Sequence, residues 1–309
     1  MKLGADVGGT KTLLEARAGA FTLLRRRYEN AAFADFDSLL ATFLAELRAA
    51  RPAPITAACF AVAGPVDSER AKLTNGPCWQ LDTEALQARV GIERVALVND
   101  FLAVIAGLET LGPADLRELQ PGRPARLGVR LAVGPGTGCG VGISAGEVAL
   151  PSEGGHAAFA PFDESSLRLW QQLGGPTRFV PVEAVLSGEG LGACYQLSAG
   201  PTATRIAPSD VTTRAEAGEP AACTAVRLFA RCLGAFAGDL ALACLPRGGV
   251  YLAGGIPARL PARLFDEAVL EGFLRKGNCT VPMRDFPLHL VCCDDVGLRG
   301  ALRIAGDFA

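Results

Sequence analysis

Asp100 stands at the point where a short apolar run ends and a helical pattern begins. The run covers residues 95–98, and its two β-branched residues favour a buried strand. From Phe101 onwards, apolar residues recur at helical spacing. An open α/β sheet holds its ligands at such a strand-to-helix junction, so we place the chemistry of the chain at Asn99 and Asp100. The alternative is that Asp100 only caps the helix, because Asp and Asn are favoured there.

A second group of residues near the start of the chain has the composition of a phosphate-binding turn. Gly8, Gly9 and Thr10 stand between two extended apolar patterns and predict a tight hairpin whose backbone N–H groups no Cβ shields. Successive N–H groups form a concavity that suits phosphate oxygens. Asp6 would repel phosphate unless a cation lay between them, which implies Mg²⁺, bound directly or through water. An ordinary hairpin turn is the alternative that this motif leaves open.

A similar turn recurs later in the chain, between apolar runs at 131–133 and 140–143. Its glycines and threonine are Gly134, Gly136, Thr137 and Gly138. Two such hairpins, one at the start of each half, suggest a duplicated unit of the order strand-strand-strand-helix-strand-helix-strand. Neither turn fits a Walker A loop or a Rossmann motif, because a strand pattern follows each of them where those motifs need a helix.

A polar loop follows the second turn. Glu153 and His156 enclose two glycines, and His156 is one of only two histidines in the chain. A carboxylate accepts hydrogen bonds and an imidazole donates or accepts, so the pair suits the recognition of hydroxyl groups. Glu183 adds an acid within an apolar stretch, although a solvated helix face would explain it equally well. Zinc is discounted, because neither a second His nor a Cys lies at ligand spacing.

The last glycine pair closes an apolar strand pattern at residues 249–256. At Gly254 and Gly255 a flat group such as adenine could lie against bare backbone. The other histidine, His289, alternates within a strand pattern at 288–291, and we interpret it as structural.

The elements that must position these residues alternate along the chain. An amphipathic helix is predicted after Asp35, a continuous apolar strand at 55–63 and a second helix after Asp82. A long helix at 223–245 and a closing helix at 296–304 are predicted in the second half. Alternating strands and helices predict an α/β fold with parallel pairing and both sheet faces covered.

Length and charge limit the function classes. A chain of 309 residues, half of them hydrophobic, predicts one large or, as we favour, two domains with a sizeable core. Its net charge of -2 and its lack of a long basic run argue against nucleic acid as a partner.

The chain shows neither a signal peptide nor a membrane span. The helix at 223–245 contains Arg227, Arg231 and Asp239, which indicates a buried helix. The ten cysteines are scattered and form no Cys-x-x-Cys pair, so we interpret them as reduced and mostly packed thiols. A cytoplasmic enzyme or binding protein fits these features best.

The motifs, taken in chain order, resemble those of a known family. They are Gly4-Ala5-Asp6-Val7-Gly8-Gly9-Thr10, Val98-Asn99-Asp100-Phe101, Gly134-Pro135-Gly136-Thr137-Gly138, Glu153-Gly154-Gly155-His156 and Leu252-Ala253-Gly254-Gly255-Ile256. Together they are similar to the bacterial glucokinases that lack a zinc motif. Each motif is modestly specific, whereas the five in this order are strongly so.

The resemblance implies the actin-like ATPase (ribonuclease H-like) fold, an α/β architecture in which duplicated βββαβαβ units form two lobes that flank a cleft. Residues 1–106, completed by the C-terminal helix at 294–309, would be the small lobe with Asp100 and the first phosphate turn. Residues 107–293 would be the large lobe with the second phosphate turn, the sugar loop and the adenosine site. ATP would bind between the glycine turns, with glucose beneath the γ-phosphate.

The resemblance also implies the activity, which is ATP-dependent phosphorylation of D-glucose at the 6-hydroxyl, giving glucose 6-phosphate and ADP. Asp100 would be the general base, while Mg²⁺ at Asp6 and the amides of the turns spread the charge of the phosphoryl oxygens. Residues implied to hold the sugar hydroxyls are Asn99, Glu153, His156 and Glu183. Residues implied to contact the nucleotide are Asp6, Gly8, Gly9, Thr10, Gly134, Gly136, Thr137, Gly138, Gly254 and Gly255.

One departure from the family pattern is Lys11, where these glucokinases usually have Asn. Lys at this place is more similar to the repressor/ORF/kinase sugar kinases. Those, however, carry a Cys-rich zinc loop after the histidine, and residues 157–161 contain no cysteine here.

Other functions stay open. The nearest is a kinase of the same fold that acts on mannose or an N-acyl hexosamine. A sugar-sensing regulator without catalysis is disfavoured, because the first turn begins within ten residues of the terminus and leaves no room for a helix-turn-helix. A filament-forming actin relative would not need Glu153, His156 and Glu183. The sequence is compatible with a homodimer but does not determine the oligomeric state.

Overall fold

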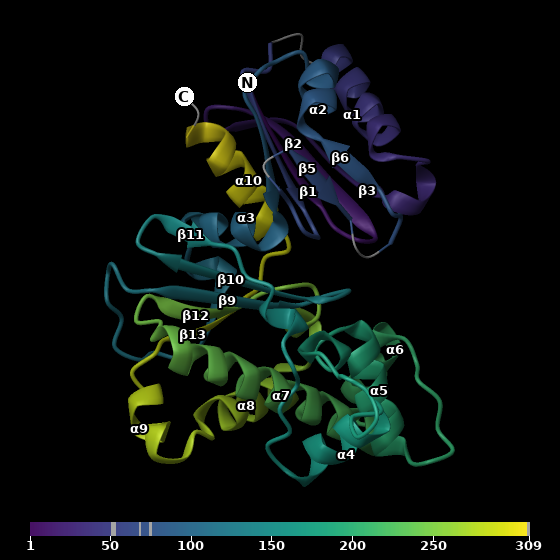
Figure 1. Ribbon diagram of the computed structural model, residues 1–309, viewed down its shortest axis with the longest axis vertical. Helices are drawn as coiled ribbons and strands as arrows, with labels where there is room; N and C mark the ends of the chain where they lie inside the picture. The colour runs from purple at the N-terminus through teal and green to yellow at the C-terminus, as the bar shows by residue number, and fades with distance from the viewer. Residues whose placement is uncertain (51–53, 68, 74–75, 308–309) are drawn as a thin grey trace. The chain divides into compact units, whose positions relative to one another are not determined.

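The computed structural model describes residues 1–50, 54–67, 69–73 and 76–307 (Figure 1). The chain divides into two compact units. The first comprises Met1–Gly112 together with Asp295–Ala309, and the second comprises Pro113–Asp294. Each unit has a hydrophobic core of its own.

The first unit is built on a five-stranded sheet of order β3-β2-β1-β4-β7. Its strands are β1 (Lys2–Val7), β2 (Lys11–Ala18), β3 (Phe21–Glu29), β4 (Ala57–Val62) and β7 (Val95–Asn99), beside a small β5 (Arg70–Lys72) and β6 (Gln80–Asp82) pair. Its helices are α1 (Phe36–Ala50), α2 (Thr83–Val90), α3 (Asp100–Gly107) and α10 (Val296–Asp307).

Strand β4 shows why both faces of this sheet are covered. All its residues are buried, and they alternate between two clusters. Ala58, Phe60 and Val62 pack in the core that includes residues of α1 and α2. Ala57, Cys59 and Ala61 pack with alanines of α3 and α10. This period of two places a helix layer on each face, which confirms the prediction from the apolar run.

The second unit repeats the plan, with strand order β11-β10-β9-β12-β13-β8. Its strands are β8 (Leu116–Gln120), β9 (Arg130–Pro135), β10 (Cys139–Ala145), β11 (Val148–Leu150), β12 (Gly249–Leu252) and β13 (Leu288–Val291). Its helices are α4 (Glu164–Gln172), α5 (Gly188–Ala199), α6 (Pro208–Glu216), α7 (Pro220–Cys244), α8 (Ala262–Leu274) and α9 (Thr280–Met283). The first five strands have the same order as in the first unit, so the predicted duplication of a βββαβαβ unit is confirmed.

Some elements differ from the sequence-based predictions. The sequence pattern did not predict β8, which follows Gly112 and pairs antiparallel with β13. The predicted buried strand before Asp100 is the edge strand β7, in which only Leu97 is fully buried. Helix α7 is largely buried, as predicted, and no described helix is long and apolar enough to cross a membrane. All ten cysteines are free thiols, and half of them are buried.

Candidate active site

Asp100 is the first residue of α3, and its neighbour Asn99 is the N-cap. Asn99 Oδ1 accepts a hydrogen bond from the Phe101 N–H at 2.9 Å, and Asn99 Nδ2 donates to the Gly64 carbonyl at 3.1 Å. Asn99 is thus the N-cap, and Asp100 Oδ1 accepts from the same Phe101 N–H at 3.0 Å, so Asp100 also contributes to the start of the helix. Each end of the Asn99 amide makes one bond within the chain and retains capacity for a second.

The register of the parallel strands brings Asp100 to the edge of the sheet where the first glycine turn lies. Val7 of β1 pairs with Val62 of β4, and Val62 pairs with Asn99 of β7. The three strands thus end at one level, with the turn after the first and Asp100 after the third. Neighbouring strands lie about 4.8 Å apart, so roughly 10 Å separates the two strand ends.

Asp6 lies beside the first turn of α10. A Cβ placed at Gly297 would lie only 2.8 Å from Asp6 Oδ2, so the carboxylate approaches the helix backbone closely. The positive end of a helix dipole stabilises a nearby carboxylate. Asp6 therefore has a structural contact in addition to the metal-binding role predicted for it.

The first glycine turn is held by Asn30, a buried residue at the end of β3 that the sequence analysis did not single out. Asn30 Nδ2 donates to the carbonyls of Gly8 at 2.8 Å and Gly9 at 3.3 Å. Its backbone N–H donates to the Thr10 carbonyl at 2.9 Å. In a trans peptide the N–H points opposite to the C=O, so the N–H groups of Gly9 and Thr10 are directed away from Asn30. A row of outward N–H groups is the arrangement that binds anions.

The second glycine turn is held by backbone alone. The Gly136 N–H donates to the Gly138 carbonyl at 2.7 Å, and the Gly136 carbonyl accepts from the Gly188 N–H at 3.0 Å. Since that carbonyl faces Gly188, the N–H of Thr137 is directed away from it. Ser187 caps α5 through its hydroxyl and so fixes the position of Gly188.

The two glycines of the last pair play different parts. Gly254 has a φ of +88°, and a Cβ there would lie 2.5 Å from the Pro135 carbonyl oxygen, so glycine is needed for the backbone to pack. Around Gly255 no atom lies within 4 Å of a Cβ position. Packing within the chain thus explains why position 254 requires glycine, but it does not explain why position 255 is glycine.

Three of the four residues predicted to bind sugar hydroxyls lie together in the second unit. His156 Nδ1 lies 3.0 Å from Glu153 Oε2, and His156 Nε2 lies 3.5 Å from Glu183 Oε1. Gly154 and Gly155 make this possible, because a Cβ at Gly155 would lie 1.8 Å from the Cys139 carbonyl oxygen. The loop is therefore pressed against the start of β10.

The side chains of this cluster differ in exposure. Glu153 is 64% and His156 60% exposed, whereas Glu183 is 30% exposed. The cluster faces solvent and is open to a ligand. Lys11, whose role the sequence left open, forms an ion pair with Glu29 on the neighbouring strand at 3.5 Å.

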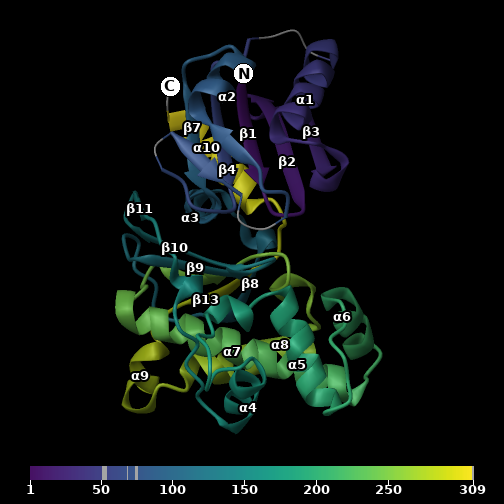
Figure 2. The same cartoon turned by 45° about the vertical axis from the view of Figure 1, so that its right-hand side comes forward.

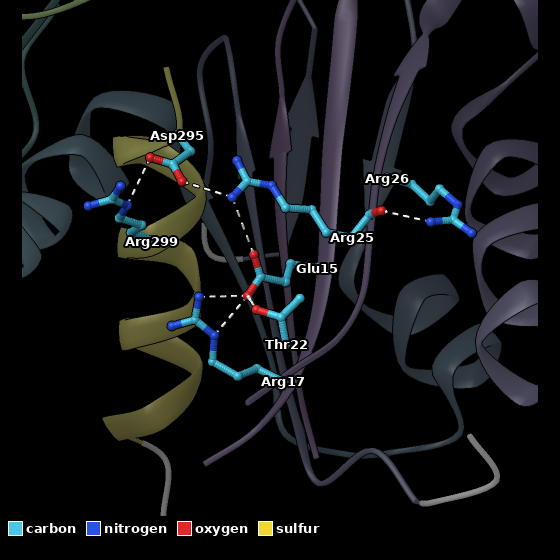
Figure 3. Close-up of polar contacts among 7 residues, drawn as sticks. All are labelled: Glu15, Arg17, Thr22, Arg25, Arg26, Asp295 and Arg299. Atoms are coloured by element: carbon cyan, nitrogen blue, oxygen red, sulfur yellow. Dashed lines mark hydrogen bonds and ion pairs between the residues drawn. The ribbon is translucent and has the colours of Figure 1, made fainter. Parts of the chain in front are cut away.

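A network of two buried carboxylates and partly exposed arginines, which was not predicted from the sequence, connects β2 and β3 to the start of α10 (Figure 3). Glu15 is 1% exposed and contacts Arg17 at 2.6 Å. Arg25 lies between Glu15, at 3.8 Å, and Asp295, at 2.9 Å, and Arg299 contacts Asp295 at 2.8 Å. The sequence shows Arg25 only as part of a short basic run, because its acidic partners are distant in the chain.

Comparisons with known proteins agree with the fold and the motifs. The family model described as Glucokinase matches residues 3–307. A glucokinase of Nostoc punctiforme is 36% identical over 97% of both chains. The crystal structure of a glucokinase from an Antarctic psychrotroph has a TM-score of 0.82 at 27% identity, covering 99% of this chain and 98% of that one. A ROK family glucokinase from Streptomyces griseus, in complex with glucose and AMPPNP, has a TM-score of 0.71 at 20% identity over 99% of both chains.

The duplicated sheets and these structural likenesses define an actin-like ATPase fold. Within that class the chain belongs to the glucokinase family, because the family model covers nearly its whole length. The resemblance stated from the motifs is thereby confirmed, and the chain is a glucose kinase rather than a regulator without catalysis.

Proposed function

We propose that the protein transfers the γ-phosphoryl group of ATP to the 6-hydroxyl of D-glucose, with the residue roles predicted from the sequence. The observation that carries the proposal is the pair of glycine turns whose carbonyls are tied back, so that amide N–H groups are presented for phosphate oxygens. Neither Gly8 nor Gly136 has a positive φ, and a Cβ at Gly136 would meet no atom closer than 4.0 Å. Approach of a ligand therefore explains Gly136 better than packing within the chain does.

Asp100 is the proposed base. Its carboxylate would accept the proton of the 6-hydroxyl as the sugar oxygen attacks the γ-phosphorus in line, which leaves ADP as the departing group. The amides of both turns would stabilise negative charge on the transferred oxygens. Asn99 serves as N-cap of α3 and, with its remaining hydrogen-bonding capacity, would contact a sugar hydroxyl.

Mg²⁺ is part of the proposal through Asp6. Mg²⁺ is commonly bound by one or two carboxylates together with substrate phosphates, so a single carboxylate directly before a phosphate turn fits it. When bound, the ion would neutralise phosphate charge. Among the described residues, no group of three or more His, Cys, Asp or Glu side chains is placed to hold a metal ion.

Glu153, His156 and Glu183 are the proposed sugar-binding residues. His156 lies between the two carboxylates, so its ring is oriented while the remaining carboxylate oxygens stay available as acceptors. Carboxylates that each accept hydrogen bonds from sugar hydroxyls discriminate against sugars that lack a matching group. We also propose that the protein is cytoplasmic and that it forms a homodimer. Sedimentation velocity would test the homodimer.

A coupled assay with ATP and Mg²⁺ on a panel of sugars tests the proposal. We expect the highest kcat/KM with glucose, and lower values with mannose and N-acetylglucosamine on the same preparation. A clear preference for N-acetylglucosamine would overturn the assignment of glucose while leaving the role of Asp100 intact.

A further inference from the structure

A cavity of about 360 Å³ lies among α4, α5, α7 and α8 of the second unit. These helices pack side by side (Figures 1 and 2). Sites for small molecules typically have volumes of roughly 300 to 1,000 Å³. The cavity touches the C-terminal end of α5, whereas Ser187 and Gly188, which hold the second turn, are at its N-terminal end. A helix of 12 residues is about 18 Å long, so the cavity is distinct from the proposed sugar and ATP sites.

The cavity carries positive charge. Arg168, Arg227 and Arg231 line it, together with one carboxylate, Glu271. Arg231 is paired with Asp163 at 3.3 Å and with Glu271 at 3.7 Å, and Arg168 is paired with Glu164.

Arg227 differs from the other two arginines of the cavity. Within the described parts of the chain it has no ion-pair or hydrogen-bond partner, and it is exposed. Arg231 follows it by one helical turn on the same face, a like-charge spacing that destabilises a helix slightly. The cavity thus holds an uncompensated guanidinium group that an anion would neutralise, and a guanidinium fork matches phosphate geometry.

Two hydroxyl groups in the same wall have acceptor capacity to spare. Ser198 Oγ donates to the Cys194 carbonyl at 2.8 Å, and Thr224 Oγ1 donates to the Pro220 carbonyl at 2.8 Å. Because each hydroxyl proton is already used, these oxygens can only accept from a ligand. Glu271 is an acceptor as well. The cavity therefore offers both cationic hydrogen-bond donors and hydrogen-bond acceptors. An inorganic anion would bind to the donors but would leave the acceptors without a partner.

We propose that this cavity is a second binding site, and that it takes a hexose phosphate. Its phosphate group would face Arg227 and Arg231, and its hydroxyl groups would donate to Ser198, Thr224 and Glu271. The proposal rests on the geometry of the cavity and does not depend on the proposed reaction.

Calorimetric titration of the full chain with glucose 6-phosphate tests the proposal. Excess glucose and a non-hydrolysable ATP analogue are present throughout, so that the substrate sites are filled. We expect binding to persist under these conditions, and R227Q to weaken it about tenfold or more, because a charge-assisted hydrogen bond is lost. R284Q is the matched control, since Arg284 is an exposed arginine of the same unit outside the cavity, and it should leave the affinity unchanged.

Two further measurements distinguish the part of the site that would bind the phosphate group from the part that would bind the sugar hydroxyls. One uses inorganic phosphate as the ligand, and the other uses the S198A variant. We expect phosphate alone to bind at least about tenfold more weakly than the sugar phosphate, and S198A to weaken only the sugar phosphate. Loss of glucose 6-phosphate binding in excess glucose, or equal effects of R227Q and R284Q, would overturn the proposal. So would equal affinity for inorganic phosphate. Sedimentation velocity gives a further check, because a dimer that R227Q dissociates in the absence of ligand would assign the cavity to a second copy of the chain.

Discussion

The two glycine turns close equivalent hairpins in the two units, but the chain holds them in different ways. The first is fixed by one buried side chain, Asn30, which bonds to the carbonyls of Gly8 and Gly9. The second is fixed by a backbone N–H at the start of α5, that of Gly188. Both arrangements direct amide groups outward, so the same local result has two origins.

This difference extends to the residues around each turn. In the first unit, strand register and helix capping place Asp100, and both come from the regular sheet. In the second unit, Glu153 directly precedes one short 3-10 segment, and Glu183 belongs to another. Glu183 lies four residues before Ser187 in the chain, so the segment that carries a proposed sugar-binding residue also holds the second turn. We therefore expect changes at Asp100 to affect the chemical step, changes at Glu183 to affect sugar selection, and changes in either turn to affect ATP binding.

The largest effect is expected from Asp100→Asn. Asn has nearly the same size but cannot accept a proton at neutral pH, so kcat should fall by roughly 10² to 10⁴ with glucose binding retained. Steady-state kinetics with calorimetric binding of glucose would measure both. Retention of more than about a tenth of wild-type kcat, with phosphoryl transfer still limiting, would rule out Asp100 as the base.

The next largest effect is expected from the sugar cluster. E183Q or H156A should lower the ratio of kcat/KM for glucose to that for mannose by about 10- to 150-fold, since a lost hydrogen bond to a charged group changes binding by about 1.5 to 3 kcal/mol. The matched control is E164Q, an exposed acid of the second unit outside the cluster. An unchanged ratio in both cluster variants would show that these residues do not select the sugar.

The turns themselves allow a direct comparison. A Cβ at Gly136 has open space, whereas a Cβ at Gly8 would lie 3.1 Å from the Lys11 carbonyl oxygen. G136A should therefore raise KM for ATP, by roughly tenfold, without changing the melting temperature, while G8A should also lower the melting temperature by a few degrees. Asn30→Ala should resemble G8A, because it leaves buried carbonyls unpaired at about 1 to 3 kcal/mol. If G136A raised KM for glucose and ATP equally, the second turn would not be specific to the nucleotide.

The sequence predicted those parts of the molecule that depend on local pattern. Both turns, the helix after Asp35 and the duplicated strand order follow from glycine position and hydrophobic period, and the structure confirms them. The role of Asn30 could not be predicted, because its side-chain hydrogen bonds reach residues about twenty positions away in the chain. The residues next to it in the sequence form no motif that indicates this role. The network of Glu15, Arg25 and Asp295 could not be predicted for the same reason, since Arg25 and Asp295 are 270 residues apart. Exposure of His156 was also unpredictable, because it depends on how the loop lies on β10.

The smallest effect is expected from Asp295, the residue directly before α10. Two arginines, Arg25 and Arg299, neutralise its carboxylate. Burial raises the pKa of Asp295, and hydrogen bonds from Arg299 and Arg25 outweigh burial, so that the pKa lies below its ordinary value near 3.8. A carboxyl group with a lowered pKa stabilises the folded state fully above its ordinary pKa, and this contribution is lost as the pH falls through the folded-state value.

D295N should therefore lower the free energy of unfolding at pH 7 by about 1 to 3 kcal/mol, because Arg25 and Arg299 lose the carboxylate that they share and keep only a weaker, neutral partner. As the pH falls below 3.8 toward the folded-state pKa, the wild type progressively loses this contribution, so the two stabilities should approach each other in acid. Urea unfolding of both proteins between pH 3 and pH 7 would measure the difference, with kcat at pH 7 as the control for the active site. Because Asp295 anchors α10 and α10 lies against Asp6, a small rise in KM for ATP is expected alongside an almost unchanged kcat. A constant difference in stability across this pH range would show that the Asp295 carboxylate does not act through its charge.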